Sequence, residues 1–269
     1  MVQKTAIETG YDAVYEAMPG SPTLRRMWRE LASGTDFPED FYHISFVTLD
    51  QHQRMQAELR LSPGDTLVDL ACGMGGPALL AAKNTGARLT GVDISGVAVK
   101  LATQRAAELG MSDTARFVTG RFDDTGLESA SADAVMSEDA LQYVPDKTAA
   151  IREVARILRP GGRLVFAVFE LDAARCAGLP NLGDDPVEDY RPILESAGFR
   201  IERYEEIPGC PEPVRGTYQA LLDSGDALVA EMGIVAATAL FSECRLMLQT
   251  GMYKSRVLIV ATKAGDPRE

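Results

Sequence analysis

The chain is poor in metal-binding side chains. Its 269 residues include only two histidines, His43 and His52, which argues against a zinc centre built on histidine. The four cysteines are scattered and none forms a C-x-x-C pair, a pattern that favours free thiols in a reducing compartment. We therefore predict a cytoplasmic protein without a bound metal.

Positive charge and long apolar runs are also scarce. Lys and Arg number 27 against 39 Asp and Glu, a net charge of −12, whereas nucleic-acid binding requires a basic face. No apolar run approaches the roughly 18 residues of a membrane span. The N-terminal residues also lack the apolar core of a signal peptide. Neither nucleic acid nor a membrane is an expected partner, and the oligomeric state is left open, with a homodimer as one option.

Short apolar runs alternate with helical periods through the middle of the chain. This alternation predicts an α/β fold with a doubly wound, mostly parallel sheet covered by helices on both faces. A late strand at 253–263 is expected to pair antiparallel with the strand at 199–207, which completes seven strands. The other strands are expected at 65–71, 88–93, 115–119, 133–137 and 163–169, and the helices at 76–85, 95–109, 145–158 and 186–197.

The helical segments at either end suggest a division into a core and a lid. Residues 61–211 and 251–269 are expected to form a Rossmann-like core. Residues 1–60 form an N-terminal helical lid segment in this scheme, and residues 212–250 form a helical lid insertion between two adjacent strands.

A glycine-rich turn follows the first predicted strand. Residues 73–78, GMGGPA, fit G-x-G-x-x-G/A, and Asp93 lies 20 residues after Gly73, where an acid that binds a ribose belongs. The pattern fits a dinucleotide or S-adenosylmethionine (SAM) equally well. Asp69 favours SAM, because a carboxylate buried near the strand end is compensated by an ammonium and a sulfonium but opposed by a pyrophosphate.

Four motifs in register resemble the class I SAM-dependent methyltransferases, and more narrowly their bacterial small-molecule members of the UbiE-like and natural-product type. The resemblance covers about residues 40–263 and implies transfer of a methyl group to O, N or C of a small molecule. It also implies that Gly73 and Gly75 face the methionine part of SAM, that Asp93 holds the ribose hydroxyls, and that Asp69 lies near the ammonium. The motifs are VDLACGMGG, GVDIS, DAVMSEDALQYVPD and ILRPGGRLVF.

The chain departs from this family at two places. Relatives usually carry Gly-Asp after the third strand, but Arg121 stands here and cannot accept a hydrogen bond. The adenine is therefore expected to be held by the backbone at Phe122, by Asp123, or more loosely. Relatives often carry histidine after the fourth strand, where this chain has Gln142 and Tyr143. The remaining expected cofactor contacts are Ser45, Ile94, Ser137 and Gln142.

Three side chains are candidates for catalysis. His43 is the best general base if the acceptor keeps its proton, although a packing role is equally consistent with its position. Tyr143 can orient an acceptor but is a weak base, because its ordinary pKa is about 10. Glu138 follows the fourth strand and either faces a cationic acceptor or caps the next segment.

Two other functions compete with methyl transfer. An NAD-dependent oxidoreductase would use the same glycine pattern, but Asp69 and the lack of a hydride-transfer constellation count against it. A methyltransferase-like protein that binds SAM and serves another activity is kept open by Arg121 and by the absent histidine.

Overall fold

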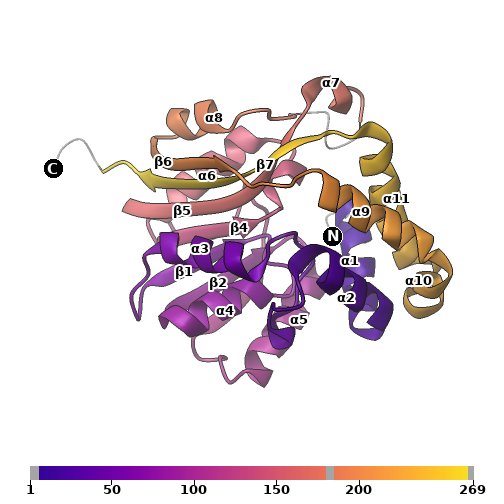
Figure 1. The fold of residues 1–269 in the computed structure, drawn as a ribbon. Coiled ribbons are helices and arrows are strands. Elements are labelled where there is room, and N and C mark those ends of the chain that lie inside the picture. Colours follow the sequence, from indigo (N-terminus) through magenta and orange to yellow (C-terminus); the bar gives the residue numbers. More distant parts are fainter. Residues whose placement is uncertain (1–5, 180–184, 266–269) are drawn as a thin grey trace.

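The computed structural model describes residues 6–179 and 185–265. Seven strands form one sheet in the order β3-β2-β1-β4-β5-β7-β6 (Figure 1). The strands are β1 (Thr66–Leu70), β2 (Arg88–Asp93), β3 (Ala115–Thr119), β4 (Ala132–Glu138), β5 (Leu158–Leu171), β6 (Phe199–Glu206) and β7 (Tyr253–Lys263).

The strand directions confirm the predicted sheet. Strands β1 to β5 pair in parallel, while β7 lies antiparallel between β5 and β6. The main difference is β5, which begins at Leu158 rather than at residue 163 because Leu158 already pairs with Ala132. The register shifts between Ala132 and Ala134, so this early pairing is separated from the main ladder by an irregularity.

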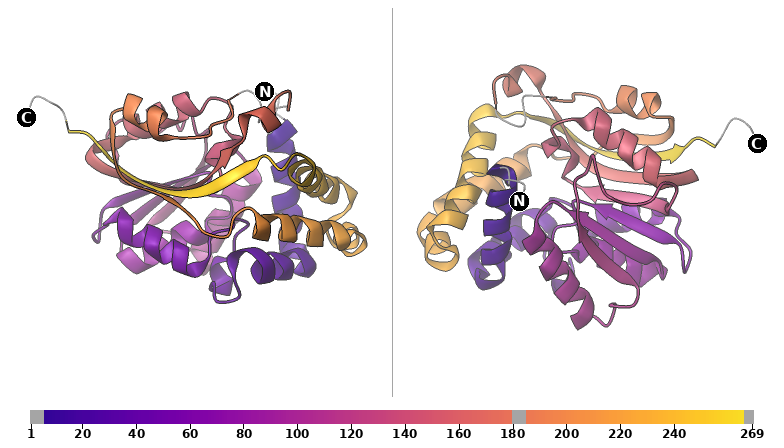
Figure 2. Two further views of the ribbon diagram at one scale, coloured as in Figure 1. Left: turned by 45° about the horizontal axis from the view of Figure 1, so that its top comes forward. Right: turned by 180° about the vertical axis from the view of Figure 1, so that it is seen from behind.

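Helices cover both faces of the sheet (Figure 2). Because strand side chains alternate, Leu67 belongs to the core beneath α3, α4 and α5, and Val68 belongs to the core beneath α6 and α8. Ser95 caps α5, since its side chain accepts a hydrogen bond from the Ala98 N–H. These helices are α3 (Leu49–Leu59), α4 (Gly76–Thr85), α5 (Gly96–Glu108), α6 (Lys147–Ile157) and α8 (Arg191–Ser196).

The predicted helix at 186–197 is wrong in its first part, because α8 begins only at Arg191. Residues 185–190 instead have no regular secondary structure. They are tied to the end of β5, where the Leu171 N–H donates to the Val187 carbonyl over 2.8 Å. A short helix, α7 (Ala173–Cys176), follows β5.

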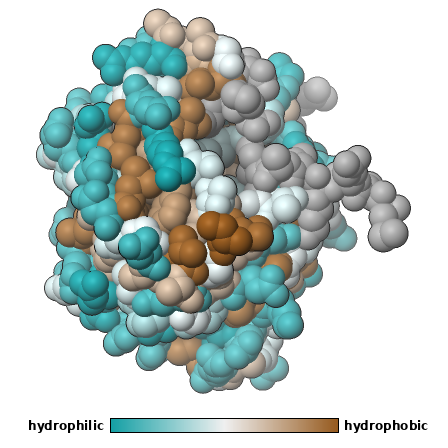
Figure 3. Space-filling model, turned by 90° about the vertical axis from the view of Figure 1, so that its right-hand side faces the viewer, coloured by the Kyte–Doolittle hydropathy of each residue, from teal (hydrophilic) through white to brown (hydrophobic). Residues whose placement is uncertain are grey.

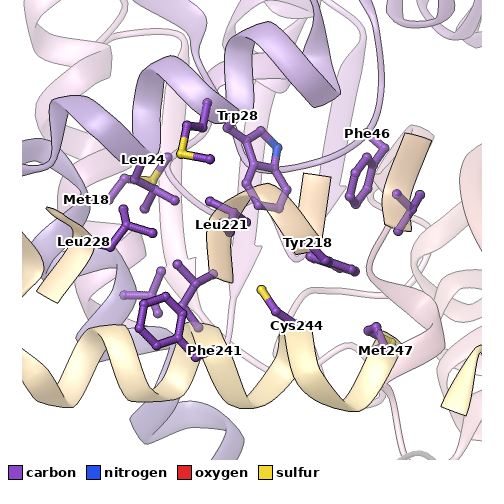
Figure 4. Packing of buried hydrophobic residues seen from close by; sticks show 14 of the residues in the cluster. Met18, Leu24, Trp28, Phe46, Tyr218, Leu221, Leu228, Phe241, Cys244 and Met247 are labelled. Carbon is purple, nitrogen blue, oxygen red and sulfur yellow. The ribbon is translucent and has the colours of Figure 1, made fainter. Parts of the chain in front are cut away.

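The remaining long helices pack on one another beside the sheet (Figure 4). α1 and α9 both pack against α11, and α2 packs against α9 and α10. Trp28, Tyr218 and Phe241 lie in this buried cluster, which also includes Phe169 of β5. The helices are α1 (Ala6–Ala17), α2 (Pro22–Trp28), α9 (Glu212–Asp223), α10 (Gly225–Met232) and α11 (Ile234–Thr250), with short turns at Met18–Gly20, Arg29–Ser33, Glu39–Phe41 and Leu141–Tyr143.

The outer side of this helical group mixes hydrophobic and hydrophilic surface (Figure 3). Ile234 and Val235 are exposed at the start of α11, at 65% and 71% of their full surface. No helix in the described ranges is long and apolar enough to cross a membrane.

Candidate active site

A cavity of about 550 Å³ lies between the sheet and the helical group. Its floor is formed where β1, β2 and β4 end, which is where ligands bind in open parallel sheets. Its opposite wall is formed by α1, α9 and α11. The volume suits a small-molecule ligand.

The glycine turn and Asp93 form one end of the cavity. Asp93 Oδ2 accepts a hydrogen bond from the Gly73 N–H at 2.8 Å, and Oδ1 accepts one from the Ser95 N–H at 2.8 Å. An ionised carboxylate has about four acceptor positions, so each oxygen keeps capacity for a ligand hydroxyl. Burial raises the pKa of Asp93 to about 6, although the two backbone donors lower it.

Gly73 adopts a left-handed backbone with φ of +50°, and a Cβ there would lie 2.9 Å from Tyr15 Oη. The residue type is therefore required by both the turn and the close approach of α1. Gly75 is also left-handed, but its missing Cβ makes room for Phe117 and Ala102 rather than for the cavity.

Asp69 is buried at 4% exposure and lines the same end of the cavity. Within the described ranges no hydrogen-bond donor reaches its carboxylate. Burial raises the pKa of Asp69 well above its ordinary value, and the charges of Glu138 and Asp93 raise it further. A positively charged ligand group would relieve all three effects at once.

Arg121 pairs with Asp123, one of the groups that the sequence offers for the adenine. Its Nε donates to Asp123 Oδ1 at 2.9 Å and its Nη2 donates to Oδ2 at 3.2 Å. Phe122, Asp123 and Arg121 all line the cavity. A ligand amino group would share Asp123 with the guanidinium, whereas the side chain of Phe122 offers only an apolar surface.

A chain of buried polar contacts runs from α3 to the cavity. His52 Nδ1 donates to Glu138 Oε1 at 2.9 Å, and Glu138 Oε2 lies 3.4 Å from Ser45 Oγ. Ser45 Oγ in turn lies 2.9 Å from His43 Nδ1. Burial raises the pKa of Glu138, but the hydrogen bond and charge of His52 outweigh it and the net pKa is lowered. Glu138 is therefore held as a carboxylate.

His43 is neutral at physiological pH. The Ser45 N–H donates to His43 Nδ1 at 3.2 Å, so Nδ1 is the acceptor and the ring proton is assigned to Nε2. Nε2 is buried without a hydrogen-bond partner among the described residues. Burial lowers the pKa of His43 to about 4, against the influence of Glu138. As arranged here, the ring is a weak base whose accepting nitrogen is already occupied.

Tyr143 belongs to a group of tyrosines around Glu243 of α11. Its hydroxyl donates to Glu243 Oε1 at 2.9 Å and lies 3.0 Å from Tyr253 Oη. Tyr218 Oη donates to the same carboxylate oxygen at 3.2 Å. Burial raises the pKa of Tyr143 well above 10, and the charge of Glu243 raises it further. Tyr143 is therefore a hydrogen-bond donor at neutral pH and not a base.

The structure brings most of the predicted site residues to this cavity. Gly75 and Ser137 do not line it, and the Ser137 hydroxyl donates instead to the Leu70 carbonyl at 2.7 Å. Gln142 lines the cavity and donates to the Asp139 carbonyl at 2.6 Å. The lining residues that the sequence had indicated are His43, Ser45, Asp69, Gly73, Asp93, Ile94, Phe122, Asp123, Glu138, Gln142 and Tyr143.

Sequence reasoning missed several side chains of the site. His52 contacts Glu138 from 86 residues away, and no local motif marks it. Tyr11 and Tyr15 of α1 also line the cavity. Glu243 could have been found, because it is the single acidic residue in the largely apolar run IVAATALFSECRLMLQT.

Comparison with known proteins supports one family. Residues 68–166 match the model of a methyltransferase domain. The chain is 29% identical over 218 residues to 27-O-demethylrifamycin SV methyltransferase of Amycolatopsis mediterranei, covering 77% of this chain and 78% of that protein. It is 27% identical over 192 residues to methyltransferase GfsG of Streptomyces halstedii, covering 67% and 68%.

A solved structure extends the likeness to the whole fold. The crystal structure of the [4+2]-cyclase SpnF covers 97% of this chain and 96% of its own, with a TM-score of 0.73 and 20% identity, which shows a shared fold. The matched domain, the two relatives and the strand order agree with one another. Together they support a class I SAM-dependent methyltransferase, with the methyltransferase domain matched over residues 68–166.

Proposed function

We propose that the protein methylates a bulky, mostly apolar metabolite, of the kind made in secondary metabolism. One observation carries this proposal: a single cavity joins the Asp93 end, where the carboxylate keeps acceptor positions open, to a wall of apolar side chains. An acceptor bound against that wall would share one space with the cofactor. The apolar lining includes Val14, Leu24, Trp28, Phe46, Phe169, Leu240, Leu246 and Met247.

The residues at the Asp93 end fit SAM. Asp93 keeps free acceptor positions for two ribose hydroxyls, and Asp69 is a buried carboxylate without a donor that would be stabilised by the ammonium and sulfonium. The turn at Gly73 leaves backbone without a Cβ facing the cavity. Phe122, Asp123 and Ile94 would contact the adenosine, and Ser45 and Gln142 would contact the methionine end.

When bound, SAM supplies a methyl group already activated by its sulfonium. The protein then mainly has to align the acceptor and exclude water, an effect worth as much as about 7–11 kcal/mol. His43, Glu138 and Tyr143 would act on the acceptor side by orienting it, because none of the three is arranged as a free base. An acceptor that needs deprotonation would therefore find its base elsewhere in the cavity or in solvent.

The two helical segments, residues 1–60 and 212–250, would act as the lid that chooses the acceptor. The cavity-lining residues of α1, α9 and α11 support this assignment. The net charge of −12 supports a partner other than nucleic acid. The four free cysteines support a reducing compartment such as the cytoplasm.

Replacement of Asp93 tests the cofactor site. Asp93→Ala should weaken binding of S-adenosylhomocysteine at least tenfold in calorimetry, because the ribose hydroxyls lose a charged acceptor. Asp93→Asn serves as a second variant that keeps the shape. Asp113→Ala, an exposed carboxylate outside the cavity, should bind like the wild type.

Unchanged binding in both Asp93 variants would refute the ribose assignment. A metabolite extract incubated with methyl-labelled SAM should yield a labelled apolar product with the wild type. Cofactor binding without any transferred label would instead favour the alternative of a SAM-binding protein with another activity.

A further inference from the structure

The lid side of the cavity carries a carboxylate with one oxygen held and one oxygen open. Glu243 of α11 lines the cavity, and its Oε1 accepts hydrogen bonds from Tyr143 Oη at 2.9 Å and Tyr218 Oη at 3.2 Å. Among the described residues, no hydrogen bond reaches Oε2. The carboxylate therefore presents an acceptor to whatever occupies the cavity.

Three elements fix the orientation of this carboxylate. Tyr143 follows β4, Tyr218 lies in α9, and Tyr253 begins β7 and lies 3.0 Å from the Tyr143 hydroxyl. With Oε1 held by two hydroxyl groups, the other oxygen has a defined direction. Such a supported side chain is typical of a recognition site rather than of a solvated surface residue.

The surroundings of the open oxygen are apolar and, in the described part of the chain, carry no opposite charge. Leu240, Leu246 and Met247 line the cavity beside Glu243 on the same helix. No ion pair within the described ranges includes Glu243. Burial raises the pKa of Glu243 even though two tyrosines donate to it. Glu243 is only half-buried, and its open oxygen is not among the fully buried unpartnered atoms, so it is accessible from the cavity. A ligand that fills the cavity would remove solvent from this oxygen and would then gain by supplying a donor, because an acceptor left unmet after desolvation costs free energy.

We propose that Glu243 Oε2 accepts a hydrogen bond from a hydroxyl group of the methyl acceptor. The acceptor would then be a bulky apolar molecule that carries a hydroxyl, bound with that group against α11. A neutral hydroxyl matches the two partners that Glu243 already has, Tyr143 and Tyr218, and a cationic ligand group is the alternative that the experiment below tests. This inference rests on the proposed function, since it names the substrate class of the same cavity.

Matched small probes test the inference by direct binding. We would measure the affinity of 2-naphthol, of 2-methylnaphthalene, which lacks the hydroxyl, and of 2-naphthylmethylamine, which is cationic at neutral pH. The wild type should bind 2-naphthol at least about tenfold more tightly than 2-methylnaphthalene, as expected for a hydrogen bond to a charged group. Glu243→Leu should reduce that preference below about threefold. Glu243→Gln should show a preference between those of the wild type and of Glu243→Leu.

The control variant is Gln249→Leu, an exposed change on the same helix that should keep the wild-type preference. S-adenosylhomocysteine should bind all variants equally, which shows that the fold and the cofactor site are intact. The inference is overturned if 2-naphthol fails to bind, if its preference survives in Glu243→Leu, or if the cationic probe binds more tightly. A wild type that binds none of the cofactor would contradict the proposed function instead.

Discussion

At the scale of single residues, the site depends on buried carboxylates with different partners. Glu138 has His52, Asp93 has two backbone N–H groups, and Asp69 has no donor within the described ranges. These partners determine which carboxylate is stabilised in its ionised form by the protein itself and which one would be stabilised by a ligand.

The sequence motifs indicated Asp69 and Asp93, because both lie at fixed positions beside the glycine turn. His52 and Glu243 could not be identified in this way, because their partners come from distant segments of the chain.

The role of His43 is tested by His43→Ala. Because its pKa is about 4 and its Nδ1 is occupied, we expect turnover to fall by less than tenfold, through lost orientation of Ser45. The affinity for S-adenosylhomocysteine should stay within about twofold. A general base is worth roughly 10²- to 10⁴-fold, so a loss of that size in the rate constant, with cofactor affinity intact, would restore His43 as the base.

At the scale of elements, the predicted sheet was reliable because buried parallel strands read as continuous apolar runs between turn signals. The segment at 186–190 was harder, since it is tied to distant residues, by the Leu171 N–H bond to the Val187 carbonyl and the Tyr190 N–H bond to the Tyr204 hydroxyl, and not by contacts within itself. Gly76, the third glycine of the turn, also makes a contact with a distant segment that the sequence does not reveal. A Cβ on Gly76 would lie 2.2 Å from the Phe41 carbonyl oxygen and 2.8 Å from that of Tyr42.

Gly76→Ala should therefore lower the free energy of unfolding by about 1–3 kcal/mol, as expected for overpacking against rigid backbone. Urea denaturation measures the change. Gly216→Ala in α9 is the matched control, because nothing lies within 4 Å of its Cβ position. That change should leave the stability equal or raise it by about 0.5–1 kcal/mol. Equal stability of the Gly76 variant and the wild type would mean that the 41–42 segment does not pack on α4 as described.

At the scale of the whole molecule, cofactor binding is coupled to protons. Burial raises the pKa of Asp93 to about 6 and raises that of Asp69 well above its ordinary value, so the free protein holds protons that the ligand must displace. Hydroxyl donors and a cation both favour the ionised carboxylates. Affinity should therefore increase as the pH rises from 5 to 7, by up to about tenfold per pH unit below each pKa.

Calorimetry at pH 6 in two buffers with different ionisation enthalpies should show net proton release when S-adenosylhomocysteine binds. Asp93→Asn should release fewer protons than the wild type. Proton uptake, or an affinity that is the same at pH 5 and pH 7, would contradict this coupling.

Strands β6 and β7 are neighbours in the sheet, although the helices α9 to α11 lie between them in the sequence. The segment that contains α9 to α11 therefore leaves the sheet at the end of β6 and returns to it at the start of the neighbouring strand β7. Because these two ends are adjacent, the length and composition of the inserted segment can change without shifting the register of the other strands. Related proteins with this fold could therefore differ in the inserted helices, and so in the metabolite that they accept, while they keep the same cofactor site.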